Sequence, residues 1–271
     1  MLMRVITAGV LLPVLLTTIK IAPPSVFSIV ALVFIGVACW ECLRMVQRDG
    51  IRPFTWLGVV AGLAVAGSFL GFEPGYATEL PLIGLTVLTV IVAMWKRSSP
   101  DEMLQTAIAT VFPVLFVGLG LAFLIGLRGM PGEDGEDLLM LLFTCVILAD
   151  TAAFYVGTAV GRRPMAPLIS PNKSWEGAMA GVAGSVLGAL VAHFWFYQRL
   201  PLLHALLLGG VLGTAAILGD LAESMVKRSA GVKDSSHLLP GHGGVLDRMD
   251  SLLFAGPVLY YYYQWFLQGA A

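Results

Sequence analysis

Continuous apolar runs of about 20 residues fill most of the sequence, and short polar connections separate them. A helix of about 20 apolar residues is long enough to cross the hydrocarbon core of a bilayer. Apolar residues make up 58% of the chain and charged residues only 12%, about half the charged share of an ordinary soluble domain. The runs do not alternate between apolar and polar residues, which favours helices over a transmembrane barrel. The sequence therefore predicts an all-α integral membrane protein.

Nine apolar segments predict about nine transmembrane helices in a single polytopic domain, residues 1–271. Residues 1–130 would supply the N-terminal helices, and residues 131–271 the half with the candidate site. The first run follows Arg4, as a signal peptide would, but no small-residue cleavage site stands out, so we interpret it as a helix. The predicted spans are 4–20, 25–47, 54–72, 80–96, 104–127, 138–160, 176–197, 202–222 and 250–268.

Lysine and arginine are distributed unequally between the two ends of the predicted helices. One side carries 13 of the 16 basic residues and the other carries Lys20, Arg128 and Arg199. Because basic loops stay in the cytoplasm, the N-terminus should be cytoplasmic and the C-terminus should lie on the far side. The two long polar loops, 161–175 and 223–249, would then face the cytoplasm. The richer set is Arg4, Arg44, Arg48, Arg52, Lys96, Arg97, Arg162, Arg163, Lys173, Lys227, Arg228, Lys233 and Arg248.

The loop 223–249 has the composition of a polyanion site. Its glycine-rich stretch, 240–244, can turn backbone N–H groups toward an anion. Asp247 and Asp250 are spaced i, i+3, so they share one face if a helix begins there, and such hard oxygen ligands suit Mg²⁺. The alternative is a solvated loop that fixes topology and touches lipid headgroups. The basic residues of the loop are Lys227, Arg228, Lys233 and Arg248.

Two further carboxylates, Asp150 and Asp220, lie in or at the end of predicted spans. A carboxylate inside a spanning helix is costly, which makes each a candidate for function. Asp220 could instead be a solvated interfacial residue, and Asp150 a structural partner of a nearby arginine. In the loop 161–175, Lys173 could bind phosphate, while Ser174 or Glu176 could cap the next helix.

The stretch from Ser224 to Asp250 resembles the phosphatidate cytidylyltransferase family. It has Ser224, then Lys227-Arg228, then Lys233-Asp234, then Pro240-Gly-His-Gly-Gly244, then Asp247-Arg-Met-Asp250. The segment from Ser170 to Gly177 resembles the family's second block, although Asn172 and Ser174 stand where the family more usually has Lys and Thr. Gly219-Asp220-Leu221 is also similar. The first 130 residues resemble the family only in being hydrophobic helices.

The resemblance implies that CTP and phosphatidic acid react to give CDP-diacylglycerol and pyrophosphate, in a bacterial inner membrane and with Mg²⁺. Some members use a second, monovalent cation, which suggests K⁺. The resemblance also implies that Asp220, Asp247 and Asp250 bind the metal, and that the same three residues and Lys233 are catalytic. The implied substrate-binding residues are Lys173, Ser224, Lys227, Arg228, Lys233, His242, Gly243, Gly244 and Arg248.

Two other functions remain as alternatives. A CDP-alcohol phosphotransferase would need a helical Asp-Gly-x2-Ala-Arg-x8-Gly-x3-Asp-x3-Asp run, which the sequence lacks. A transporter for an anionic solute would line a path with Asp150 and Asp220, but such proteins often carry inverted repeats, and no repeat is evident. The near-zero net charge argues against nucleic acid as a partner. The oligomeric state is left open, with a homodimer as one alternative.

Overall fold

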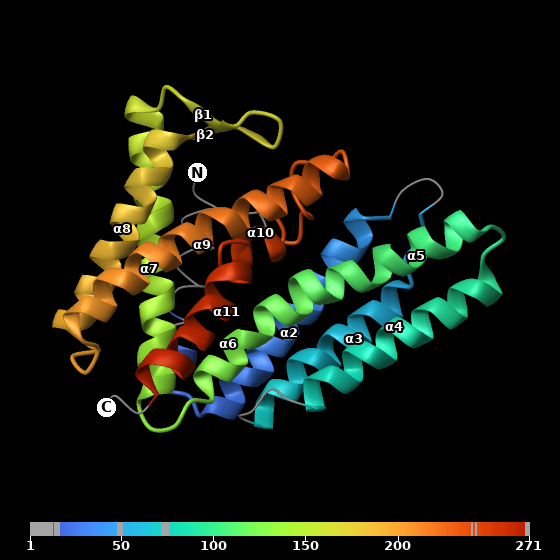
Figure 1. The fold of residues 1–271 in the computed structure, drawn as a ribbon, viewed down its shortest axis with the longest axis horizontal. Coiled ribbons are helices and arrows are strands. Elements are labelled where there is room, and N and C mark those ends of the chain that lie inside the picture. The colour runs from blue at the N-terminus through green and yellow to red at the C-terminus, as the bar shows by residue number, and fades with distance from the viewer. Residues whose placement is uncertain are drawn as a thin grey trace. The chain divides into compact units, whose positions relative to one another are not determined.

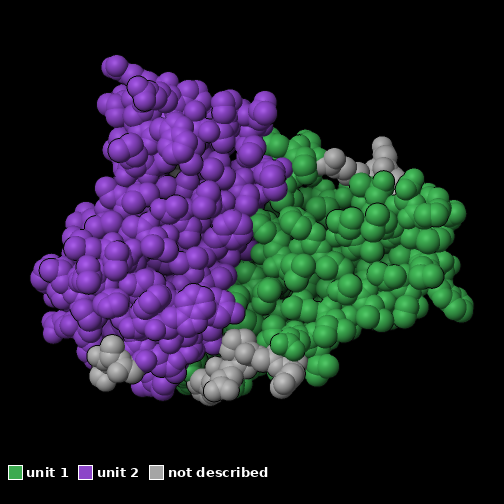
Figure 2. Space-filling model, viewed as in Figure 1, with its two compact units in different colours: residues 1–129, 226–249 green, residues 130–225, 250–271 purple. Residues whose placement is uncertain are grey.

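A computed structural model describes residues 13, 17–47, 51–71, 76–239, 241 and 243–268. The chain divides into two compact units, shown in Figure 2. Unit 1 comprises Met1–Gly129 and Val226–Met249, and unit 2 comprises Met130–Met225 and Asp250–Ala271. The predicted helix 4–20 lies largely outside the described residues, as do Arg4, Arg48 and His242.

Unit 1 is built from apolar helices. Pro24 opens its first long helix, where a missing N–H costs nothing, and Ser99 caps a later one by accepting a hydrogen bond from the N–H of Glu102. Its elements are α2 (Pro24–Met45), α3 (Thr55–Gly67), η1 (Ser68–Gly71), α4 (Tyr76–Lys96), α5 (Pro100–Pro113), η2 (Val114–Leu119), α6 (Gly120–Arg128) and α10 (Leu246–Met249).

The helical path from α5 to α6 changes its winding after a proline. Pro113 ends α5, and the next six residues form the π-helical turn η2 before α6 begins at Gly120. Proline has no N–H for the helical ladder, and insertion of a wider turn is one way in which a helix accommodates it. Gly62 of α3 lies against Gly118 of η2, since a Cβ at Gly118 would stand 3.1 Å from the Cα of Gly62. The wider turn therefore packs closely on α3.

Unit 2 contains three long helices, a small hairpin and a shorter helix. The elements are α7 (Asp134–Val160), β1 (Pro164–Ala166), β2 (Ser170–Ser174), α8 (Trp175–Phe194), α9 (Leu202–Ser229, which continues into unit 1), α11 (Leu252–Tyr262) and the π-helical η3 (Tyr263–Leu267). The strands β1 and β2 pair antiparallel, with a register shift between Pro164 and Ala166. The predicted loop 161–175 is thus a hairpin.

Helices α7 and α8 run side by side (Figure 1), and glycines allow the close approach. A Cβ at Gly184 of α8 would lie 2.5 Å from the carbonyl oxygen of Leu148, and one at Gly188 would lie 2.9 Å from the Cα of Cys145. Small residues spaced three and four apart bring helix backbones together in membranes. This contact fixes the end of α7 beside the start of α8, where the hairpin emerges.

The count of about nine spans is not confirmed. In the described part of the chain, six helical segments are long and apolar enough to cross a membrane. Of the other predicted spans, 54–72 is a shorter helix, and 250–268 is a short α-helix followed by a π-helical turn. The six are Pro24–Met45, Ala77–Lys96, Pro100–Arg128, Asp134–Val160, Trp175–Phe194 and Leu202–Ser229.

One predicted boundary is wrong. Helix α9 continues to Ser229, well beyond the predicted end at residue 222. Lys227 and Arg228 therefore lie in its last turn and not in a loop. Basic side chains are favourable there because the C-terminal end of a helix carries partial negative charge.

Candidate functional site

In unit 1, the carboxylate of Asp247 is held by four hydrogen bonds. The ammonium group of Lys227 donates to Oδ1 at 2.7 Å. Oδ2 accepts from the N–H of Gly244 at 2.7 Å, and from the N–H and the hydroxyl of Ser235, each at 2.9 Å. Only 6% of the Asp247 side chain and 11% of the Lys227 side chain are exposed. This buried ion pair fixes the start of α10 to the last turn of α9.

These contacts act in opposite directions on the ionisation of Asp247. Burial raises the pKa of its carboxyl group. The Lys227 hydrogen bond and the backbone N–H groups of Gly244 and Ser235 outweigh burial, so the pKa lies below its ordinary value. Asp247 is therefore a carboxylate throughout the neutral range, as a cation ligand must be.

Two glycines let the loop fold onto this carboxylate. Gly243 has φ of +76°, and a Cβ there would lie 2.6 Å from Oδ2 of Asp247. The carbonyl of Gly243 accepts a hydrogen bond from the N–H of Leu239 at 2.9 Å. Gly244 was expected to turn its N–H toward a substrate anion, but the structure directs this N–H to Asp247. His242, which was assigned to the same turn, lies outside the described residues.

Sequence reasoning missed Glu41, which contacts the same loop from α2. It is fully buried, and its carboxylate accepts hydrogen bonds from Ser235, Ser236, Val245 and Leu246. A carboxylate within an apolar run, the signal that selected Asp150, also marks Glu41. Nothing in the sequence pointed to its partners, which lie about 200 residues further along the chain.

In unit 2, the hairpin brings Lys173 of β2 to Asp220 of α9, with 2.5 Å between Nζ and Oδ2. The pair is more accessible than Lys227–Asp247, with 26% and 30% of the side chains exposed. Ser224 lies one turn beyond Asp220, and its hydroxyl is 3.4 Å from Oδ1. The hairpin therefore delivers one candidate phosphate-binding cation to one candidate metal ligand.

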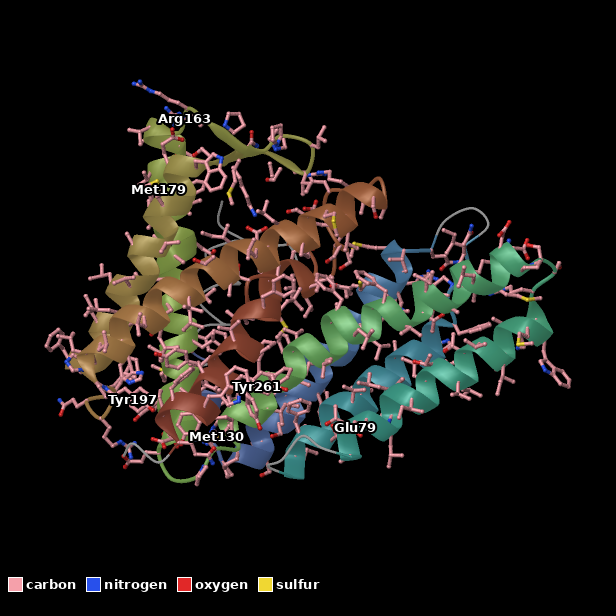
Figure 3. All side chains as sticks on the ribbon, in the orientation of Figure 1. Glu79, Met130, Arg163, Met179, Tyr197 and Tyr261 are labelled. Carbon is pink, nitrogen blue, oxygen red and sulfur yellow. The ribbon has the colours of Figure 1, made fainter. Side chains whose placement is uncertain are left out.

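Local hydrogen bonds hold the base of the hairpin. Ser174 caps α8 by accepting from the N–H of Gly177 at 3.1 Å. Glu176, in the first turn of α8, accepts from the N–H groups of Arg162 and Arg163 at 3.1 and 3.2 Å. The Arg163 side chain projects away from α8, as Figure 3 shows. Of the two candidate caps, Ser174 caps α8, whereas Glu176 holds the turn before the hairpin.

Asp250 and Asp150 also lie near this part of α9. A Cβ at Gly219, next to Asp220, would stand 2.6 Å from the carbonyl oxygen of Asp250. The following residue, Ser251, links two carboxylates: its N–H donates to Oδ1 of Asp250 at 2.7 Å and its hydroxyl lies 3.5 Å from Oδ1 of Asp150. Unit 2 thus places Asp150, Asp220 and Asp250 around the start of α11.

The remaining predicted residues lie at the surface. Lys233, Arg228 and Arg248 are exposed, and the guanidinium of Arg228 donates to the carbonyl of Val232 at 3.1 Å. Such exposed cations can reach an anionic substrate without breaking a buried contact. The structure thus places Lys227 in a nearly buried ion pair and Lys173 in a more accessible one, and leaves Arg228, Lys233 and Arg248 exposed.

The donor chemistry of these carboxylates fits Mg²⁺, which prefers hard oxygen ligands. The ammonium groups of Lys227 and Lys173 each contact an oxygen of one of these carboxylates and offset its negative charge. Within either unit, the described residues include no group of three His, Cys, Asp or Glu side chains placed to hold a metal ion. The structure assigns Asp247 to unit 1, and Asp220 and Asp250 to unit 2.

Comparison with known proteins gives the relationship of the chain. The model of the cytidylyltransferase family matches residues 2–266. A phosphatidate cytidylyltransferase of Haemophilus influenzae is 34% identical, over 96% of this chain and 97% of its own. Those of Pseudomonas aeruginosa and Bacillus subtilis are 36% and 32% identical, over 94% and 95% of this chain and 94% and 96% of their own. The segments that fold around Asp247 and Asp220 thus lie in a chain that belongs to the cytidylyltransferase family.

Proposed function

We propose that this protein transfers the cytidylyl group of CTP to phosphatidic acid, giving CDP-diacylglycerol and pyrophosphate in phospholipid biosynthesis. The similarity to proteins named phosphatidate cytidylyltransferase, over nearly the whole length of both chains, carries the proposal. The arrangement of the site supports it. Two lysine–carboxylate pairs and a set of exposed basic residues suit a reaction between two polyanions.

The reaction needs positioning and charge neutralisation more than acid–base chemistry. A phosphate oxygen of phosphatidic acid attacks the α-phosphorus of CTP, and the bond to the β-phosphate breaks as pyrophosphate leaves. The attacking oxygen is already anionic near pH 7, so no strong general base is required. Lys233, Arg228 and Arg248 are exposed and would bind the phosphates, and in-line placement would supply most of the rate enhancement.

We assign the metal to Asp220, Asp247 and Asp250, whose oxygens are of the right class. Mg²⁺ bound there would stabilise negative charge on the phosphate oxygens and the leaving pyrophosphate. Lys173 and Lys227 already neutralise two of these carboxylates. Both ammonium groups would also bind phosphate oxygens of the substrates. K⁺ remains a candidate for a second cation, and a homodimer remains a proposal for the assembly.

We infer the orientation from charge. The apolar helices and bacterial relatives make this a multi-pass bacterial membrane protein. The 13 basic residues on one side favour the inner membrane with the N-terminus in the cytoplasm, where CTP is available. The acyl chains of phosphatidic acid would remain in the bilayer while its headgroup meets CTP at the cytoplasmic surface.

The test is an assay of the purified protein in detergent. CTP, Mg²⁺ and phosphatidic acid together should give CDP-diacylglycerol and pyrophosphate in equal amounts. Omission of phosphatidic acid should abolish pyrophosphate release, and chelation of Mg²⁺ should abolish both products. Pyrophosphate release that does not depend on phosphatidic acid would contradict the proposal. So would a folded protein that releases pyrophosphate but makes no CDP-diacylglycerol.

A further inference from the structure

Glu41 lies at the end of α2, in the part of the chain where the sequence offered only hydrophobic helices. Its side chain is fully buried. Both of its carboxylate oxygens contact the loop that precedes α10, which belongs to the same unit. A buried carboxylate is costly unless hydrogen bonds replace its lost water. The partners of Glu41 therefore show what its negative charge does.

Each oxygen of Glu41 accepts two hydrogen bonds. Oε1 accepts from the hydroxyl of Ser236 at 2.5 Å and the N–H of Val245 at 3.0 Å. Oε2 accepts from the hydroxyl of Ser235 at 3.0 Å and the N–H of Leu246 at 2.8 Å. The two N–H groups lie at the start of α10, where a helix has no backbone acceptors of its own. One side chain thus holds both ends of the loop 235–245.

Ser235 connects Glu41 to the candidate site. Its hydroxyl lies 3.0 Å from Oε2 of Glu41 and 2.9 Å from Oδ2 of Asp247, and its single proton is donated to one of them at a time. Gly244 packs on the same group, since a Cβ there would lie 2.6 Å from Oε1 of Glu41. A shift of the Glu41 carboxylate would therefore change the surroundings of Asp247.

We propose that Glu41 is a positioning residue for the cytidylyl transfer, holding the loop 235–245 so that Asp247 and Lys227 keep their geometry. The proposal rests on the proposed function and extends it to a residue of the N-terminal helices. Glu41 acts through the loop and does not touch substrate. Among the described residues, four protein donors bind Glu41, and two of them are backbone N–H groups that no rotation can convert into acceptors.

The substitution Glu41→Gln separates this role from simple packing. Glutamine keeps the shape and one acceptor oxygen, but its NH2 group must face two of the four donors. A serine hydroxyl can rotate to accept from that NH2 group, whereas the N–H of Val245 or Leu246 cannot. We expect kcat per folded molecule to fall at least about tenfold, and further for Glu41→Ala. The matched control is Glu79→Gln, at an exposed position of α4 labelled in Figure 3, which should stay within about twofold of wild type.

A second measurement reports the loop without substrate. Lys233 is exposed next to the anchored segment, so trypsin cleavage after it reports how often the loop opens. We expect cleavage at this site to be at least about fivefold faster in Glu41→Ala and Glu41→Gln than in wild type or Glu79→Gln. This result is independent of the reaction. If wild type made no CDP-diacylglycerol but the cleavage pattern held, the proposed function would fail and the anchoring role would stand.

A double-mutant cycle with Ser236→Ala completes the test, because Ser236 donates to Glu41 and lies outside the assigned site. The combined loss of kcat in Glu41→Gln/Ser236→Ala should be smaller than the product of the two single losses, since both remove the same anchor. Multiplicative losses would overturn the proposal. It would also be overturned if Glu41→Gln kept kcat within about twofold and wild-type cleavage, even with a lower melting temperature. If Glu41→Ala does not fold, Glu41→Gln decides alone.

Discussion

At the scale of single residues, the two lysine–carboxylate pairs differ in what they contribute. The Lys227–Asp247 pair is nearly buried, whereas about a quarter or more of each side chain in the Lys173–Asp220 pair is exposed. Breaking a buried pair by removing one charge costs about 3–5 kcal/mol, while an exposed pair contributes about 0–1 kcal/mol. The Lys227–Asp247 pair should therefore contribute more to the stability of the fold than the Lys173–Asp220 pair does.

This difference predicts how two isosteric substitutions behave. Asp220→Asn and Asp247→Asn should each lose at least about a hundredfold in activity, roughly 2.7 kcal/mol of barrier, if both carboxylates hold the metal. Asp220→Asn should keep the wild-type melting temperature, but Asp247→Asn should melt earlier because it removes a charge from a nearly buried ion pair. Initial rates against Mg²⁺ concentration and melting curves in detergent measure both effects, with the exposed Asp101→Asn as the control. If both variants kept the wild-type rate and Mg²⁺ dependence, the metal would bind elsewhere, and Asp150 would be the next candidate ligand.

A second substitution tests an exposed charge of the loop before α10. Lys233 is exposed, so Lys233→Ala should leave the folded protein intact and cripple turnover, because a transferring phosphate loses its cation. Lys96→Ala removes an equally exposed charge and should have little effect. The comparison is of kcat and melting temperature for the two variants. Turnover of Lys233→Ala within about twofold of wild type, less than roughly 0.5 kcal/mol of barrier, would remove Lys233 from the site.

The residue types of the site could be predicted, but not their pairing. The spacing of Asp247, Gly243 and Gly244 marked the loop as unusual, and the structure places all three in one contact group. Which lysine meets which carboxylate depends on how the loop turns, and no sequence period encodes that turn. Glu41 escaped prediction for a related reason, since its partners are far away in the sequence.

At the scale of elements, hydropathy predicted the long helices but not the hairpin or the π-helical turns, which burial of apolar residues does not determine. Runs of apolar residues correspond to α2, α4, α7, α8 and α9. The hairpin of β1 and β2 has no alternating pattern, because it is stabilised by its own pairing and by Glu176 at its base. The π-helical turns η2 and η3 also give no hydropathy signal. The sequence also did not predict which helices pack together, although the glycines that permit the close packing of α7 and α8 can be read from it.

The packing of α7 on α8 predicts opposite effects for one substitution at two glycines. Alanine favours a helix over glycine by about 1 kcal/mol. At Gly210 of α9 a Cβ meets nothing within 4 Å, so Gly210→Ala should keep or raise the melting temperature. At Gly184 the Cβ would collide with the backbone of α7, so Gly184→Ala should lower it despite the better propensity. Melting curves of both variants in one detergent make the comparison. Equal effects would mean that the close helix contact is absent.

At the scale of the whole molecule, the division into units cuts across the order of the chain. Val226–Met249 belongs to the unit of the N-terminal helices, although in the sequence it lies between two parts of unit 2. The long-range contacts of Glu41 show what attaches it. The sequence predicted a single polytopic domain, and separated residues 1–130 from the rest only because the family's motifs lie in the C-terminal half. The sequence could not predict that Val226–Met249 packs with the N-terminal helices. Hydrogen bonds from four donors to the buried Glu41 carboxylate hold this segment, and no pattern of apolar residues encodes them.

The orientation of the chain is the last prediction, and contacts within each unit agree with the predicted distribution of charge. In unit 1, the guanidinium of Arg97 donates to the carbonyl of Arg52, which joins the α4–α5 and α2–α3 connections. In unit 2, Arg199 meets Glu133, Asp134 and Asp137, so the sparse basic charge of the predicted far side is matched by acids.

Single cysteines can decide the orientation, because the native cysteines Cys39, Cys42 and Cys145 are all buried and should label poorly. We expect His237→Cys, in the exposed loop before α10, to react with an impermeant thiol reagent only after the cells are opened. Pro131→Cys, in the exposed connection before α7, should react in cells with only the outer membrane permeabilised. The reverse pattern would place the loop 223–249 on the side of the membrane away from cytoplasmic CTP. Because basic loops resist translocation, replacing Arg162 and Arg163 with glutamine should weaken the preference without reversing it, since 11 basic residues would remain of the 13 on that side.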